Sequence, residues 1–94
     1  MYSIFFTSQA RRVFKKLPSD VQDTLKKESA TLSSNPLAGE PLQGRYRAYR
    51  SLHKSYQGVA YRIIYQILSK TNMIVIVLAD KRENIYKRLE EMKI

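Results

Sequence analysis

The amino-acid sequence predicts an α+β fold, a small sheet dominated by antiparallel pairing with an N-terminal helical hairpin packed on one face. Apolar residues recur at helical spacing before residue 35 and after residue 82, whereas β-branched and aromatic residues fill 58–79. A loop rich in proline and glycine, 36–44, separates the two regions. The predicted order is β-α-α-β-β-β-α, and the length predicts a single domain over residues 1–94.

The first third of the chain predicts one strand and two helices. The aromatic segment 2–7 has the composition of a strand, and Ser8 is the expected N-cap of a helix that Pro18 ends. Ser19 is the expected cap of a second helix, which stops at the Asn-Pro pair 35–36. Because the connection between them is so short, the two helices are expected to pack as an antiparallel hairpin.

The second half of the chain predicts three strands and a last helix. Residues 46–54 are a polar strand candidate and 58–68 a stronger one, with a turn at 69–72. The segment "MIVIVLA", 73–79, is apolar at every position, as expected of a central strand covered on both faces. Helical spacing in the tail predicts a helix over 82–93. The sheet face opposite the hairpin is expected to stay open or to hold a groove.

The charge balance is the strongest compositional signal. Seventeen Lys and Arg against eight Asp and Glu give a net charge of +9, which favours polyanionic partners such as nucleic acid, an anionic surface or an acidic protein. The absence of cysteine excludes disulfides and cysteine-based zinc sites and fits a cytoplasmic protein. There is no signal-peptide pattern, and the longest apolar run is too short to cross a bilayer, so no membrane partner is expected.

The basic residues form two groups. One group lies on the outer faces of the predicted helices and is expected to be solvated helix surface. The other lies in or beside the predicted sheet among several tyrosines, an arrangement suited to single-stranded nucleic acid, with cations on phosphates and rings under bases. The helix group is Arg11, Arg12, Lys15, Lys16, Lys26 and Lys27, and the sheet group is Arg45, Arg47, Arg50, His53, Lys54, Arg62, Lys81 and Arg82.

Few kinds of catalysis fit these residue types. A metal site would need carboxylates, and the acidic residues show no spacing of convergent ligands, so no metal or other cofactor is expected. Neither a glycine-rich phosphate loop nor a serine triad is indicated. RNA supplies its own nucleophile, the 2′-hydroxyl, so its cleavage needs only orientation, positive charge at the phosphate and proton transfer. Arginine suits the phosphate because it stays charged and donates in a fork.

Arg62 lies inside the otherwise apolar strand "AYRIIYQI", residues 60–67. Strand alternation puts Tyr61 on one face of the sheet and Arg62 on the other. A fixed positive charge is almost never fully buried without a partner. Two interpretations remain open at this point: Arg62 forms a structural ion pair with Asp80 or Glu83, or it faces a substrate.

The segment "GVAYRIIYQI", 58–67, followed by an apolar strand and then by "DKRENIY", 80–86, resembles the RelE/ParE toxin superfamily of bacterial and archaeal toxin–antitoxin systems. The resemblance runs nearly from end to end. "LKK" in the second helix, "NPLAGEPLQG" as the loop and "YRSL" at the start of the next strand match in kind and order. The combination of Y-R-I-I-Y with K-R-x-x-I-Y is fairly specific in so short and basic a chain.

The resemblance implies a ribosome-dependent endoribonuclease that cuts mRNA in the ribosomal A site. The residues that match the catalytic positions of RelE-type members are Arg62, Arg82 and Tyr86. The resemblance gives the two arginines the phosphate charge, and gives Tyr86 a base to stack on or a proton to move. Without it, Tyr86 would be equally well explained as packing at the start of the last helix.

RelE-type members also use basic residues on the preceding strand, one of them as general base. The matching strand of this chain offers Arg50, His53 and Lys54, and the register of the hairpin decides among them. Histidine exchanges protons most readily near neutral pH, although His53 could equally be an ordinary surface residue. Further contacts to RNA are expected from a set of three: Arg45, Arg47 and Lys81.

Two other functions fit the same sequence. A ParE-type toxin has the same fold but binds and inhibits DNA gyrase, and a non-catalytic basic module would only bind RNA or an acidic partner. In either toxin case the resemblance implies a cognate antitoxin, expected to be acidic and partly disordered when free, with mRNA and the ribosome as further partners of a nuclease. DNA is expected to be bound only through the toxin–antitoxin complex.

Overall fold

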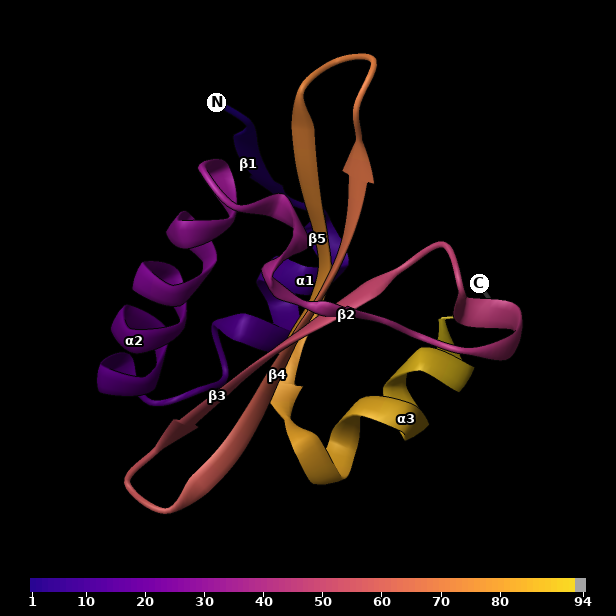
Figure 1. Cartoon of the computed structure of the whole chain (residues 1–94). Helices are drawn as coiled ribbons and strands as arrows, with labels where there is room; N and C mark the ends of the chain where they lie inside the picture. Colours follow the sequence, from indigo (N-terminus) through magenta and orange to yellow (C-terminus); the bar gives the residue numbers. More distant parts are fainter. Residues whose placement is uncertain (93–94) are drawn as a thin grey trace.

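The computed structural model describes residues 1–92 and contains a strongly twisted five-stranded sheet between two helical layers (Figure 1). The strand order is β1-β5-β4-β3-β2, with β1 parallel to β5 and the other neighbours antiparallel. The strands are β1 Ser3–Phe6, β2 Glu40–Pro41, β3 Arg50–Tyr56, β4 Val59–Leu68 and β5 Met73–Lys81. The helices are α1 Ser8–Phe14, α2 Ser19–Ala30 and α3 Arg82–Glu91, and the short 3-10 turns are η1 Thr31–Ser33, η2 Pro36–Ala38 and η3 Gly44–Tyr46.

The predicted α+β class and element order are confirmed, with one addition. The two-residue strand β2 forms inside the loop expected at 36–44 and pairs with β3. The last helix begins at Arg82 as expected; residue 93, where its end was predicted, lies outside the described residues. Among residues 1–92, no helix combines the length and the hydropathy that a membrane-spanning segment needs.

The caps of the N-terminal hairpin differ from the prediction. Thr7, not Ser8, caps α1, because its hydroxyl accepts a hydrogen bond from the Ala10 amide at 3.1 Å. Pro18 occupies the cap position of α2 and offers no side-chain acceptor, so Ser19 is the first helical residue instead of its cap. The α-helix ends at Ala30, and η1 continues the chain toward the loop. These shifts of one residue or one turn leave the hairpin itself as predicted.

The start of β3 was predicted too early. Gly44 adopts a positive φ of 66° and begins the 3-10 turn η3, so the extended strand starts only at Arg50. The strand then runs to Tyr56 and reverses through Gln57 and Gly58, which both have positive φ, the geometry of a two-residue hairpin turn. This tight turn fixes the register of β3 against β4 and thereby settles which side chains stand opposite Arg62.

The two faces of the sheet are covered by different helices (Figure 1). One face is covered by the helical hairpin of α1 and α2, and we call it the hairpin face. Its buried contacts include Leu25, Ile63 and Tyr65. The α3 face packs against α3, where Ile85 and Leu89 meet a smaller set of strand residues. Because α3 covers only part of that face, the remainder, over β3 and β4, is left for a groove. The central strand β5 is covered on both faces, as predicted.

Candidate active site

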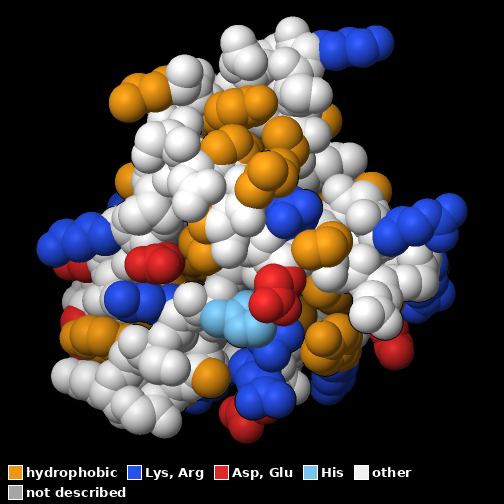
Figure 2. Space-filling model, viewed as in Figure 1, with side chains coloured by type: hydrophobic (Ala, Val, Ile, Leu, Met, Phe, Trp, Pro, Cys, Tyr) orange, Lys and Arg blue, Asp and Glu red, His pale blue; other side chains and the backbone are white. Residues whose placement is uncertain are grey.

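A line of three residues crosses the α3 face on neighbouring strands. His53 of β3 stands directly opposite Arg62 of β4, and Arg62 stands opposite Asp80 of β5. Directly opposed side chains on one face of a sheet start about 5 Å apart, so the three groups are close neighbours. His53 is exposed, Arg62 is half-buried and Asp80 is buried. Figure 2 shows the chain's one histidine, in pale blue, at the surface beside Lys and Arg side chains.

Asp80 is neutralised by Arg88, not by Arg62. One oxygen of the Asp80 carboxylate accepts a hydrogen bond from Nε of Arg88, on α3, and the other accepts one from the Lys81 amide at 2.7 Å. This ion pair ties α3 to the end of β5. Within residues 1–92 the guanidinium of Arg62 has no ion-pair or hydrogen-bond partner, so the structural pairing with Asp80 or Glu83 is not formed.

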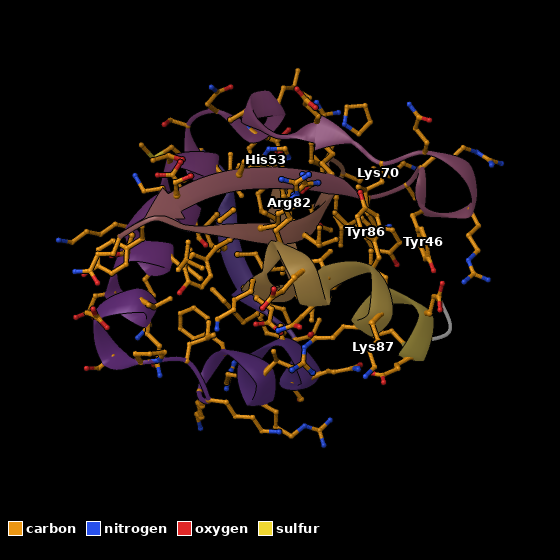
Figure 3. The ribbon with its side chains drawn as sticks, turned by 90° about the horizontal axis from the view of Figure 1, so that it is seen from below. Tyr46, His53, Lys70, Arg82, Tyr86 and Lys87 are labelled. Carbon is orange, nitrogen blue, oxygen red and sulfur yellow. The ribbon has the colours of Figure 1, made fainter. Side chains whose placement is uncertain are left out.

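The start of α3 brings Arg82 and Tyr86 to the same side of the sheet. Both project from the solvent-facing side of the helix, and Tyr86 is 54% exposed in spite of its size. Figure 3 shows them on the helix that lies over the sheet, with His53 on the strand behind. Ile85 and Leu89 of the same helix are buried and hold it in place, so the tyrosine is presented on a fixed support.

A cleft of about 340 Å³ joins His53, Arg62 and Tyr86, whereas Arg82 lies outside its lining. We call it the cleft; its floor holds His53 and Arg62, and Tyr86 borders one side. Residues 40–43, which we call the cleft wall, form the opposite side, together with Tyr46 of η3. A second hollow of about 710 Å³ begins beyond Tyr86, so the tyrosine stands between two depressions. The residues lining this second hollow are Gly58, Val59, Ala60, Lys81, Arg82, Glu83 and Tyr86.

Two of the three residues predicted to contact RNA lie at the margins of these depressions, and the third does not. Lys81 lines the second hollow. The Arg45 guanidinium lies over the ring of Tyr46, 4.9 Å from its centroid, and donates to the Tyr46 hydroxyl at 2.7 Å. Arg45 therefore lies next to the cleft, in contact with Tyr46 of its lining. Arg47 is exposed and donates to the Gly44 carbonyl at 3.3 Å, away from the cleft lining.

Arg50 and Lys54 do not lie beside Arg62. Strand alternation places both on the hairpin face, because they flank Leu52, which packs into that core. The ammonium of Lys54 is 3.7 Å from the Glu28 carboxylate of α2. Arg50 donates to loop carbonyl oxygens. Of the three candidates on β3, only His53 shares a cleft with Arg62.

Sequence reasoning missed Ser51 and the cleft wall. Ser51 lines the cleft, and its buried hydroxyl has no hydrogen-bond partner within residues 1–92. The wall could not be assigned before β2 was known, because a loop rich in proline and glycine carries no strand pattern. Alternation along β3 was the available signal for Ser51, since it shares a face with His53 two residues later. No group of three or more His, Cys, Asp or Glu within residues 1–92 is arranged to hold a metal ion.

The comparison with known families decides the identity of the chain. The model of the ParE-like toxin of type II bacterial toxin–antitoxin systems matches residues 4–90. The chain belongs to this toxin family. The predicted resemblance to the RelE/ParE toxin superfamily is therefore confirmed. The chain is also similar to toxin RelG of Mycobacterium tuberculosis, with 32% identity over 89 residues, covering 93% of this chain and 98% of that protein.

Solved structures of RelE-type toxins have the same fold as this toxin. The toxin–antitoxin complex RelBE2 of Mycobacterium tuberculosis matches with a TM-score of 0.78 and 30% identity, covering 86% of this chain and 98% of that chain. A variant of the Escherichia coli toxin RelE in the free state matches with a TM-score of 0.77 and 23% identity, covering 98% and 95%. The second likeness concerns the fold alone.

Proposed function

We propose that this toxin is a ribosome-dependent endoribonuclease that cleaves translated mRNA and so inhibits translation. The observation that carries the proposal is the Arg62 guanidinium, which is half-buried in the cleft, opposite His53, without a partner among residues 1–92. A cation that the fold leaves unpaired in a concave site is suited to an anionic ligand, and arginine binds phosphate oxygens in a fork.

The proposed reaction uses the RNA 2′-hydroxyl as nucleophile. His53 takes the proton of this hydroxyl while the 2′-oxygen forms a bond to the adjacent phosphorus and the bond from phosphorus to the 5′-oxygen breaks. The products are a 2′,3′-cyclic phosphate and a 5′-hydroxyl. Arg62 and Arg82 bind the phosphate oxygens, whose negative charge grows in the transition state. Tyr86 stacks on a base next to the scissile bond or donates the proton that the 5′-oxygen needs.

Dependence on the ribosome follows from how little the cleft itself provides. Among the described residues that line the cleft, His53 is the one imidazole and Arg62 the one Lys or Arg side chain. Orientation of the reacting groups is worth several kcal/mol in catalysis, and the decoding site of the ribosome can supply it. Cleavage of free RNA at a comparable rate would contradict this part of the proposal.

The first test is primer extension on a defined mRNA translated in vitro. The wild-type toxin is expected to give discrete cuts that require ribosomes, and Arg62→Ala is expected to lower the cleavage rate by about 10²- to 10³-fold. Arg12→Ala is the matched control, because it removes the same charge from the exposed surface of α1. Equal cleavage by Arg62→Ala and wild type would contradict the proposal.

A second candidate is the inhibition of DNA gyrase by binding, and the ParE-like description of the matched family favours it. The same proteins decide between the two functions in a supercoiling assay. A folded, growth-inhibiting wild type that leaves mRNA intact and blocks supercoiling would establish the second candidate. Loss of mRNA cleavage and of growth inhibition together in Arg62→Ala would establish the first.

We also propose a cognate antitoxin as protein partner. RelE-type toxins have been solved as complexes with antitoxins, including RelBE2 and RelE bound to a RelBc peptide. The net charge of +9 favours an acidic, partly disordered segment that orders on binding. We expect it to cover the cleft or to displace α3, with DNA contacted through the complex. A complex structure that leaves both untouched would contradict this expectation.

A further inference from the structure

Gly39, immediately before the cleft wall, is held by side chains through both its amide and its carbonyl. Its amide donates to the Tyr65 hydroxyl at 2.9 Å, and its carbonyl accepts from Nε and Nη2 of Arg50 at 3.0 and 2.6 Å. The same Tyr65 hydroxyl donates to the Pro36 carbonyl at 2.6 Å, and Arg50 also donates to the Leu37 carbonyl at 3.4 Å. We call Arg50, Tyr65 and Gly39 the loop anchor.

The anchor is rigid because its two side chains come from paired strands. Arg50 on β3 and Tyr65 on β4 are directly opposite in register, and Tyr65 is fully buried. Gly39 fits against them with no room to spare, since a Cβ there would lie 2.8 Å from both the Ser51 carbonyl and the Tyr65 hydroxyl. The loop backbone is therefore held at one distance from the sheet.

The cleft wall follows the anchor within one to four residues. Glu40 pairs with Ser51 and Pro41 with Arg50 in the β2–β3 register, and the Leu42 amide donates to the Tyr49 carbonyl at 2.9 Å. The side chains of residues 40–43 line the cleft opposite Tyr86. The position of this wall bounds the space over His53 and Arg62, and the anchor fixes Gly39, the residue immediately before the wall.

We propose that Arg50 and Tyr65 are positioning residues that hold the cleft wall over the bound RNA, although neither lines the cleft. This inference rests on the proposed nuclease function for its substrate and on the anchor geometry for its mechanism. The hydrogen bonds of Arg50 go to backbone oxygens of Leu37 and Gly39, so its guanidinium binds the loop before the wall and not a phosphate. Tyr65 acts through the same loop from the other strand.

Amide hydrogen exchange in the free toxin tests the anchor without any RNA. Tyr65→Phe keeps the ring and removes one acceptor and one donor, and Arg50→Gln removes the fork. Both are expected to speed exchange of the Gly39 and Leu42 amides by roughly tenfold while amides of β4 and β5 keep their protection. Arg12→Gln, the matched substitution on α1, is expected to leave all these rates unchanged. Unchanged exchange at Gly39 in both anchor variants would overturn the proposal.

Single-turnover cleavage on mRNA-programmed ribosomes tests the consequence for substrate. The anchor variants are expected to raise the toxin concentration at half-maximal rate by roughly tenfold and to change the rate at saturation less. Because both act on one loop, the double variant is expected to be no worse than the more impaired single variant. Arg50→Lys is expected to behave like Arg50→Gln, because an ammonium cannot reproduce the fork.

The outcomes separate the anchor from other roles of Arg50. Rescue by Arg50→Lys together with a large fall in the saturated rate would show a charge acting on the phosphate and would overturn the proposal. Faster exchange with an unchanged half-saturating concentration would also overturn it, since the wall would then not position RNA. A wild type that cuts no mRNA would refute the proposed function instead, and the exchange rates would still decide whether the anchor holds the wall.

Discussion

The basic residues on the two faces of the sheet differ in whether they have hydrogen-bond or ion-pair partners. On the hairpin face, Arg50 and Lys54 are satisfied by loop carbonyls and by Glu28. On the α3 face, His53 and Arg62 stand opposite each other, and Arg62 has no partner within residues 1–92. The basic residues of the hairpin face have hydrogen-bond or ion-pair partners, because a charged side chain that is buried without a partner lowers the stability of the folded protein.

This difference separates basic residues paired within the fold from the candidate site residues more sharply than charge alone does. Along β3 and β4 the sequence alternates between the two faces, so neighbours in the chain lie in different surroundings. Asp80 shows that the pairing is selective: it lies opposite Arg62 in register and yet binds Arg88 of α3. Arg62 is thereby left available in the cleft, where Tyr86 and the wall enclose it.

The largest effects are expected from adjacent residues on the two faces of β4. Ile63→Ala removes a fully buried side chain on the hairpin face and is expected to lower the free energy of unfolding by about 3 kcal/mol. Arg62→Ala is expected to change that free energy by less than about 0.5 kcal/mol while lowering the mRNA cleavage rate by about 10²- to 10³-fold. Urea denaturation of both variants at constant pH measures the contrast.

Equal losses of unfolding free energy in Arg62→Ala and Ile63→Ala would contradict the contrast between the two faces. If Arg62→Ala destabilised the protein as much as Ile63→Ala, its guanidinium would serve the fold, and loss of activity could not be assigned to the cleft. If it stabilised the protein, a repulsive cluster of cations would be relieved, which would strengthen the assignment of a site built for an anion.

The fold was largely predictable because the patterns that produce it are local. Helical spacing over residues 8–35, the apolar run 73–79 and the loop at 36–44 gave the order of elements, and the strand alternation around Arg62 gave its face. The sequence motif also gave Arg82 and Tyr86, which the structure brings to the same side of the sheet. Their chemical roles stay a prediction until cleavage is measured.

The remaining features depend on register and on distant contacts, which no local pattern encodes. The choice among Arg50, His53 and Lys54 needed the two-residue turn at 57–58, because a shift by one residue exchanges the faces of the strand. The pairing of Asp80 with Arg88 depends on where α3 packs. The anchor at Gly39 joins residues 26 positions apart through one tyrosine hydroxyl, so a motif search could not reveal it.

The next largest effect on stability is expected at the ion pair of the α3 face, between Asp80 and Arg88. Arg88→Ala removes the partner of the buried Asp80 carboxylate and is expected to destabilise the protein by about 2–3 kcal/mol. The double variant Arg88→Ala/Asp80→Asn is expected to recover part of this loss, because no buried charge is then left alone. Thermal unfolding of the single and double variants tests this, and equal losses in both would mean that Arg88 acts through packing only.

A smaller effect of opposite sign is expected at Ser51, the buried polar group that the cleft leaves unsatisfied. Ser51→Ala removes a hydroxyl that has no partner among residues 1–92, and it is expected to leave stability unchanged or to raise it by up to about 1 kcal/mol. Denaturant titration measures this, with cleavage assayed on the same sample. A clear loss of stability would show that the Ser51 hydroxyl is hydrogen-bonded in solution. The polar groups of the α3 face would then have more hydrogen-bond partners than the structure shows.

The smallest effect concerns the tip of the β3–β4 hairpin and depends on pH. The Tyr56 hydroxyl donates to the Asp20 carboxylate of α2 at 3.1 Å, and this hydrogen bond is the main cause that raises the pKa of the phenol above its usual value near 10. Because the folded pKa is the higher one, the contact stabilises the fold fully below about pH 10. Its contribution is lost as pH rises through the folded value.

Tyr56→Phe isolates this contribution from the titration of the many lysines, which both proteins share. The wild type is expected to melt slightly higher than the variant at pH 8, and the difference is expected to vanish as the pH is raised above the pKa of the phenol. At higher pH a phenolate beside a carboxylate repels, so the order of the two melting temperatures can invert. A difference in melting temperature that stays constant across this pH range would show that packing of the Tyr56 ring holds the β3–β4 turn to α2. The hydrogen bond to Asp20 would then contribute nothing measurable to stability.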